Sequence, residues 1–306
     1  MIRAFALLLF AVLAAPAAAQ FRSAVDLVTF GVTVVDSEGQ VVTGLTVDDF
    51  EVIEEGEEQD VEFFAAGTGE GSGAPVLHLG LLLDTSGSMD DELEEAKTSA
   101  IRFLSSLRKA EDITLVDFDT EVRVAQYSNA DFPRLVERVR AREPEGWTAL
   151  YDALGVYLDG AFSQDGQKIL VIYTDGEDTR SAINFGDTQD LLRASDVTVY
   201  VVGLLRNGGL SGGAQDRMRM QQMADITGGR AYFPLSIEAL DDVYGRVQEE
   251  IDARYTLGYV PRNLVWDGSW RGVSIRLVRP GHAGLELRTR EGYYAPYRDP
   301  DQQNDF

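Results

Sequence analysis

Residues 76–88 read VLHLGLLLDTSGS, a nearly continuous apolar run followed at once by side chains that carry oxygen. An apolar run of this length next to turn-forming residues is typical of a buried strand. The following segment, from about Asp90 to Lys109, repeats apolar residues at helical spacing and predicts a helix. A buried strand that leads directly into a helix is how an α/β unit begins.

The same alternation continues along the chain. Further buried-strand runs occur at Ile113–Phe118, Lys168–Tyr173 and Val197–Gly203, with helical patterns between them. We expect the last helix to begin at Ser236, a residue type that caps helices well. Strands that alternate with helices predict an α/β fold, with a doubly wound and mostly parallel sheet covered by helices on both faces.

Alternating patterns typical of half-buried strands lie on either side of this unit, at residues 20–64 and 254–298. Residues 20–64 carry twelve acids and one base, whereas residues 254–298 carry eight arginines and three acids. Each segment is too short to build a robust core alone, and their charges of −11 and +5 attract. We therefore expect the two segments to pair in a small β-sandwich-like domain. The expected organisation is a signal peptide at 1–19, a β segment at 20–64, a linker at 65–75, the α/β domain at 76–253, a β segment at 254–298 and a tail at 299–306.

The first residues have the pattern of a secretory signal peptide, with one basic residue, Arg3, before an apolar run that ends in Ala17-Ala18-Ala19. The run is shorter than the roughly 20 apolar residues that cross a bilayer, which disfavours a membrane anchor. Cleavage after Ala19 would leave a secreted or periplasmic chain. No second long apolar run follows, so we expect no stable insertion in a membrane.

Composition limits the function classes. The chain carries a net charge of −24, which argues against binding to nucleic acid or to anionic lipid. It has no cysteine, so disulfides cannot supply stability. A hydrophobic content of 44% is sufficient for packed cores.

The residues that follow the first buried strand carry the chemistry. Asp84, Ser86 and Ser88 place three oxygen-bearing side chains on one tight loop, at the strand end where open α/β sheets bind their ligands. Gly87 allows the backbone to turn sharply between the serines. Hard oxygen ligands of this kind suit Mg²⁺. Taken alone, the loop could equally be a helix cap.

These residues resemble the metal-ion-dependent adhesion site of the von Willebrand factor A family, which opens with an Asp-x-Ser-x-Ser loop. Two more segments are similar to the family's motifs: residues 146–154, GWTALYDAL, and residues 174–176, TDG. The resemblance implies that Thr148 and Asp175 complete the metal site, with both serines and the threonine in direct contact with the ion. Segments in both β flanks resemble a bacterial subgroup of exported proteins with this domain.

The resemblance implies a Mg²⁺-loaded binding module, with Mn²⁺ or Ca²⁺ as possible substitutes, that captures a Glu or Asp carboxylate of a partner protein. The aromatic residue Trp147, beside Thr148, is expected either at the ligand surface or in a packing role. We expect no enzymatic activity. Serine hydrolysis has little support, because neither His78 nor His282 lies near a serine in a nucleophile elbow. Two alternatives remain open: a metal-assisted hydrolase with Asp84 as nucleophile, and an envelope protein in which the ion only stabilises the fold.

Overall fold

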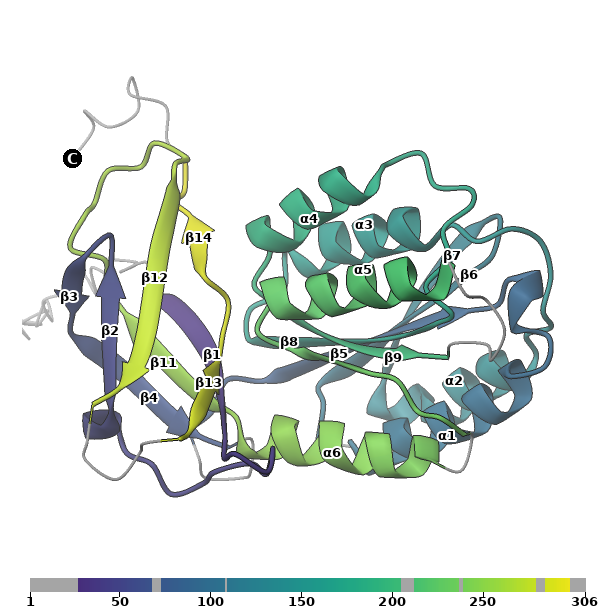
Figure 1. Cartoon of the computed structure of the whole chain (residues 1–306), viewed down its shortest axis with the longest axis horizontal. Coiled ribbons are helices and arrows are strands. Elements are labelled where there is room, and N and C mark those ends of the chain that lie inside the picture. The colour runs from purple at the N-terminus through teal and green to yellow at the C-terminus, as the bar shows by residue number, and fades with distance from the viewer. Residues whose placement is uncertain are drawn as a thin grey trace, which may run out of the picture.

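The computed structural model describes residues 27–67, 73–107, 109–204, 212–236, 239–278 and 284–297. The expected signal peptide and tail lie outside these ranges. Two units are seen: an α/β unit, and a β unit built from both flanking segments (Figure 1). The strands of the α/β unit are β5 (Leu77–Asp84), β6 (Asp112–Phe118), β7 (Val122–Ser128), β8 (Gln167–Thr174), β9 (Val197–Gly203) and β10 (Arg230–Tyr232). Its helices are α1 (Leu93–Ser106), α2 (Phe132–Arg140), α3 (Leu150–Ala161), α4 (Phe185–Ala194), α5 (Gly212–Ile226) and α6 (Ala239–Ala253).

The central sheet has the strand order β10-β9-β8-β5-β6-β7, and all neighbours are parallel except β6 and β7. Helices α1, α2 and α6 pack on one face and α3, α4 and α5 on the other (Figure 1). Strands β5 and β8 are buried along their whole length, because both faces of the sheet are covered. The prediction of a doubly wound, mostly parallel sheet is confirmed.

One helix start differs from the sequence prediction. The first helix begins at Leu93, because Gly87–Met89 form a 3-10 turn that closes the Ser86–Ser88 loop before the α-helix starts. The last helix is described from Ala239, whose N–H donates to the carbonyl of Ser236. Residues 237 and 238 lie outside the described residues, so the expected start at Ser236 stays a prediction.

The β unit consists of two four-stranded sheets with the orders β13-β1-β11-β4 and β14-β12-β2-β3. Each sheet combines strands from before and after the α/β unit: β1 pairs with β11 and β13, and β2 pairs with β12. Aromatic and branched side chains from both sheets form one core. The strands are β1 (Val28–Val35), β2 (Phe50–Glu54), β3 (Glu57–Gln59), β4 (Val61–Ala66), β11 (Tyr255–Tyr259), β12 (Trp270–Leu277), β13 (Glu286–Arg288) and β14 (Gly292–Tyr294).

The two crossings between the units lie side by side. Strand β4 extends to Ala66, two residues into the segment expected as linker, because Ala66 pairs with Tyr255 at the start of β11. Arg254 is the single residue between α6 and β11. The chain therefore enters and leaves the α/β unit beside the same pair of strands. Within the described ranges, every helix lacks the length and apolarity needed to cross a membrane.

Candidate metal centre

The three segments singled out in the sequence come together at one end of the central sheet. Strand β5 ends at Asp84 and its parallel neighbour β8 ends at Thr174, with Leu83 in register with Tyr173. Because the carboxyl ends of parallel strands meet at one edge, the loops after β5 and β8 are neighbours.

Asp84 is fully buried, and both of its carboxylate oxygens accept hydrogen bonds. Oδ1 accepts from the backbone N–H of Ser86 at 3.0 Å and from its hydroxyl at 2.6 Å, and Oδ2 accepts from the Thr174 hydroxyl at 2.6 Å. Burial raises the pKa of Asp84 to about 7, the bonds from Ser86 and Thr174 oppose the rise, and the charge of Asp175 adds to it. In the part of the chain that the structure describes, no cation forms an ion pair with this carboxylate.

The two serines face each other across the turn. The hydroxyl oxygens of Ser86 and Ser88 are 3.0 Å apart, and Ser86 is buried. Two hydroxyl oxygens and a buried carboxylate thus lie together within five residues of chain.

Thr148 lies on a loop that packs against this turn. The N–H of Gly87 donates to the carbonyl of Gly146 at 3.2 Å, and the N–H of Glu145 donates to the carbonyl of Thr85 at 2.9 Å. Gly146 has a φ of 73°, and a Cβ there would lie 2.4 Å from the hydroxyl of Thr120, so only glycine fits this approach. Thr148, two residues after Gly146, is buried.

The loop after β8 brings Asp175 to the same place. Asp175 is half-buried, accepts from the N–H of Glu177 at 3.1 Å and is close enough to Asp84 to affect its pKa. The N–H groups of Thr179 and Arg180 both donate to the carbonyl of Thr148 at 3.0 Å. Asp178 caps α3, because its carboxylate accepts from the N–H of Tyr151 at 3.0 Å. The structure thus joins the Thr148 and Asp175 loops through their backbones.

Trp147 is 64% exposed, and its backbone N–H donates to the Thr120 hydroxyl at 2.9 Å. An indole this exposed is not held in a core. Of the two roles expected for Trp147, the surface position is therefore the one that the structure supports.

The donor set fits a hard divalent cation. Within the described ranges no group of three or more His, Cys, Asp and Glu residues forms a metal cluster, so the ligands here would include hydroxyl oxygens. Carboxylate and hydroxyl oxygens are ligands that Mg²⁺ accepts, with water completing its shell. A cation would also neutralise Asp84, whose burial without a positive partner is unfavourable.

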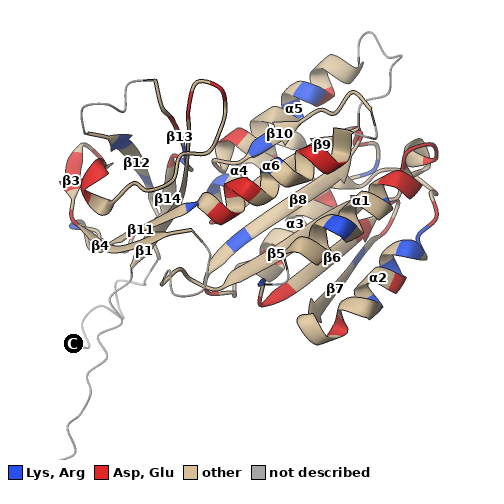
Figure 2. Ribbon diagram, turned by 90° about the horizontal axis from the view of Figure 1, so that it is seen from below, with Lys and Arg blue, Asp and Glu red and all other residues tan. Residues whose placement is uncertain are grey.

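Sequence reasoning missed the residues that hold these loops in place. Asp117 is fully buried at the end of β6 and forms ion pairs with three arginines: with Arg123 at 2.6 Å, Arg138 at 2.7 Å and Arg142 at 3.2 Å. Two of them lie on or directly after α2, a helix that carries several basic residues (Figure 2). Buried Lys97 of α1 donates to the carbonyl of Arg142 at 2.8 Å, and it also donates to the carbonyl of Arg140. These contacts anchor the start of the loop that leads to Thr148.

The architecture and the three loops define the class to which the chain belongs. The sequence pattern of the von Willebrand factor type A domain matches residues 78–246, more than half of the chain. The chain therefore belongs to the von Willebrand factor type A domain family.

Individual relatives are distant. The von Willebrand factor A domain-containing protein 3A of Homo sapiens is 27% identical in an alignment of 175 residues that covers 54% of this chain and 14% of that protein. A von Willebrand factor type A structure from Catenulispora acidiphila is 12% identical, covers 92% of this chain and 76% of that one, and has a TM-score of 0.48. The PilB minor pilin from Streptococcus sanguinis is 14% identical, covers 59% and 63% of the two chains, and has a TM-score of 0.47.

Proposed function

We propose that this protein is an exported binding module that holds one divalent cation, most simply Mg²⁺, and uses it to capture an acidic residue of a partner protein. The buried carboxylate of Asp84 carries the proposal. It lies at the carboxyl end of a parallel sheet, beside two hydroxyls, and lacks a positive partner among the described residues.

The residues have separate roles in this proposal. The hydroxyls of Ser86, Ser88 and Thr148 would contact the cation directly, and Asp84 and Asp175 would hold it largely through water. Thr174 fixes the Asp84 carboxylate by its hydrogen bond of 2.6 Å. When bound, the ion supplies a positive charge that is only partly neutralised by its ligands, and that charge attracts a carboxylate oxygen.

The surroundings of the site favour a locally recognised ligand. Exposed acids surround it, among them Asp90, Glu121, Glu145 and Glu177, so acidic partners are repelled at long range. That repulsion is screened beyond about 10 Å at 0.1 M salt, whereas contact with the ion is local. Trp147 would supply apolar contact area next to Thr148, because aromatic residues are frequent anchors at interfaces.

The test is capture of the partner from the cell envelope by immobilised protein, in Mg²⁺ and in chelator. Partners retained in Mg²⁺ and released by chelator are then challenged with a glutamate-containing peptide and with its glutamine counterpart. The proposal requires that the glutamate peptide competes and the glutamine peptide does not. Capture that persists in chelator would assign binding to another surface.

A further inference from the structure

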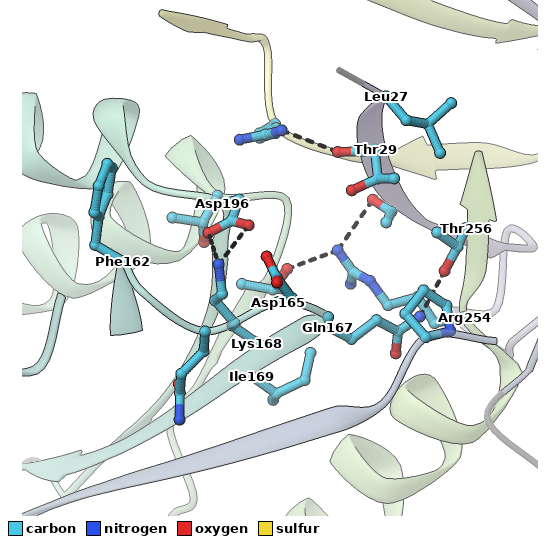
Figure 3. A pocket seen from close by; sticks show the side chains of 17 residues that line it. Leu27, Thr29, Phe162, Asp165, Gln167, Lys168, Ile169, Asp196, Arg254 and Thr256 are labelled. Carbon is cyan, nitrogen blue, oxygen red and sulfur yellow. Dashed lines mark hydrogen bonds and ion pairs between the residues drawn. The ribbon is translucent and has the colours of Figure 1, made fainter. Parts of the chain in front are cut away.

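A second site lies at the opposite end of the central sheet, where the α/β unit meets the β unit. A cleft of about 450 Å³ opens there between the amino ends of β8 and β9 and strands β1 and β11 (Figure 3). Its volume falls within the range of about 300–1,000 Å³ that is typical of small-molecule sites. The candidate metal loops follow the carboxyl ends of β5 and β8, so the two sites are separate.

The cleft is positively charged in a strongly acidic chain. Three cationic side chains line it, Lys168, Arg254 and Arg290, against two acids, Asp165 and Asp196. Lys168 donates to both carboxylate oxygens of Asp196 at 2.8 Å, so these two charges cancel (Figure 3). Two arginines then face one remaining acid, Asp165, and the cleft has a net charge of +1.

Arg254 is 3% exposed and hydrogen-bonds to uncharged oxygens. It donates to the carbonyl of Gly31 at 3.0 Å and to the hydroxyls of Thr198 at 2.7 Å and Thr33 at 3.3 Å. The carboxylate of Glu250 accepts a hydrogen bond from Tyr232 and forms an ion pair with Arg288. Its charge opposes the lowering of the Arg254 pKa from beyond ion-pair distance.

Arg290 is half-buried, and the charge of Asp196 acts on it from beyond ion-pair distance. It donates to the carbonyls of Thr29 at 2.9 Å and Ser195 at 3.1 Å, and its guanidinium lies 4.6 Å from the centre of the Phe30 ring. Within the described part of the chain, neither guanidinium has a carboxylate within ion-pair distance.

Two such guanidinium groups are costly without a counter-charge. Burial lowers the pKa of both Arg254 and Arg290, yet arginine stays protonated in proteins. Removing a charge from water is unfavourable unless a partner compensates, and the planar guanidinium pairs best with carboxylate or phosphate oxygens. An anion in the cleft would supply that partner.

The remaining lining indicates what the anion carries. Leu27, Ile169 and Phe162 contribute apolar surface, and Phe162 is 84% exposed. We propose that this cleft binds a small organic anion, with its acidic group on the side of Arg254 and Arg290 and its apolar body against Leu27 and Phe162. This site is independent of the proposed metal site.

The experiment titrates the full chain with benzoate as the probe, by calorimetry and by thermal melting. Benzyl alcohol has the same apolar ring without the charge, and inorganic phosphate has the charge without the ring. We expect benzoate to bind and to raise the melting temperature, and each of the other probes to bind at least about tenfold more weakly. Chelator should leave benzoate binding unchanged.

Two variants assign the site. Arg290→Gln should weaken benzoate binding at least about tenfold. Arg276→Gln is the matched control, because Arg276 is an exposed arginine of β12 that pairs with Glu51 outside the cleft, and it should bind benzoate as the unmodified chain does. Equal loss in both variants, or equal binding of benzyl alcohol or phosphate, would overturn the proposal.

If Arg290→Gln fails to fold, two other measurements decide. Phe162→Ala removes an exposed side chain and should not affect folding, but it should weaken benzoate binding. In the unmodified chain, benzoate should shift the amide resonances of Gly31 and Gly166, which line the cleft. Shifts confined to other regions would place the anion elsewhere and reject this site.

Discussion

The hydroxyl of Thr174 donates a 2.6 Å hydrogen bond to Oδ2 of Asp84, and it joins the ends of two adjacent strands in a fully buried position. The bond fixes the orientation of the carboxylate at the start of the candidate metal loop. Because both residues are fully buried, neither side chain can replace this hydrogen bond with one to water.

Removal of this donor should destabilise the protein. Thr174→Val keeps the shape of the side chain but leaves Oδ2 of buried Asp84 without its partner, which costs roughly 1–3 kcal/mol of unfolding free energy. Thr174→Ser keeps the hydroxyl and should cost less. Urea unfolding in chelator measures both variants, and equal losses would mean that the hydroxyl does not matter.

Metal binding should depend on the Asp84 loop. The chain should bind one divalent ion, and Asp84→Ala combined with Ser86→Ala should abolish Mg²⁺ binding in calorimetry while the circular dichroism spectrum stays native. At a Mg²⁺ concentration 100 times the Kd, binding should add about 2.7 kcal/mol to the unfolding free energy. A double variant that still binds Mg²⁺ would place the ion elsewhere.

Thr148 should matter more for the partner than for the metal, as the family resemblance implies. Thr148→Ala should weaken partner capture more than it weakens Mg²⁺ binding, measured with the captured partner and by calorimetry. Affinity for the partner should stay level or rise with salt, because salt screens the repulsion between the acidic chain and an acidic ligand. Partner capture that survives both Thr148→Ala and Asp84→Ala would contradict the proposed role.

The cluster around Asp117 should be a large source of stability. Asp117→Asn removes the charge that three part-exposed arginines share and should cost roughly 1.5–3 kcal/mol, as is typical when hydrogen bonds to a charged group are lost. Asp131→Asn is the matched control, since Asp131 forms an exposed pair with Arg134 and surface pairs contribute about 0–1 kcal/mol. Equal effects in denaturant unfolding would show that burial of Asp117 is unimportant.

The two β flanks should fold together. Deletion of residues 254–306 removes β11 and β12, the partners of β1 and β2, so residues 27–66 should lose their protection against hydrogen exchange. A fragment of residues 76–253 should stay folded, because the α/β unit has its own cores on both faces of its sheet. A protected β1 in the truncated chain would refute a shared domain.

The sequence predicts the parts of this structure that local patterns encode. The run from Val76 to Leu83 indicates a buried strand, because a nearly continuous apolar run of this length is typical of a strand covered on both faces. The Asp84–Ser88 loop marks the end of that strand. The same holds for β8 and for the loop at Asp175. These features depend on residues that are close together in the chain.

Features that depend on tertiary approach are not predictable in this way. In the sequence, Asp117 is an acid at the end of a predicted strand. Its ion pairs with Arg138 and Arg142 are not predictable from the neighbouring residues, because they depend on how α2 packs. Arg254 likewise reads as an ordinary basic residue at a helix end. Its burial depends on β1 crossing over it at Gly31, where a Cβ would lie 2.2 Å from its Nε.

The adjacent entry and exit of the α/β unit have a mechanical consequence. Ala66 and Tyr255 are paired neighbours in one sheet, so tension applied between the segments before β1 and after β14 passes through the hydrogen bonds of the β unit. The α/β unit lies outside that path, so it carries no load until those strands separate. The candidate metal loops, at the far end of the central sheet, would keep their geometry while the β unit is under strain.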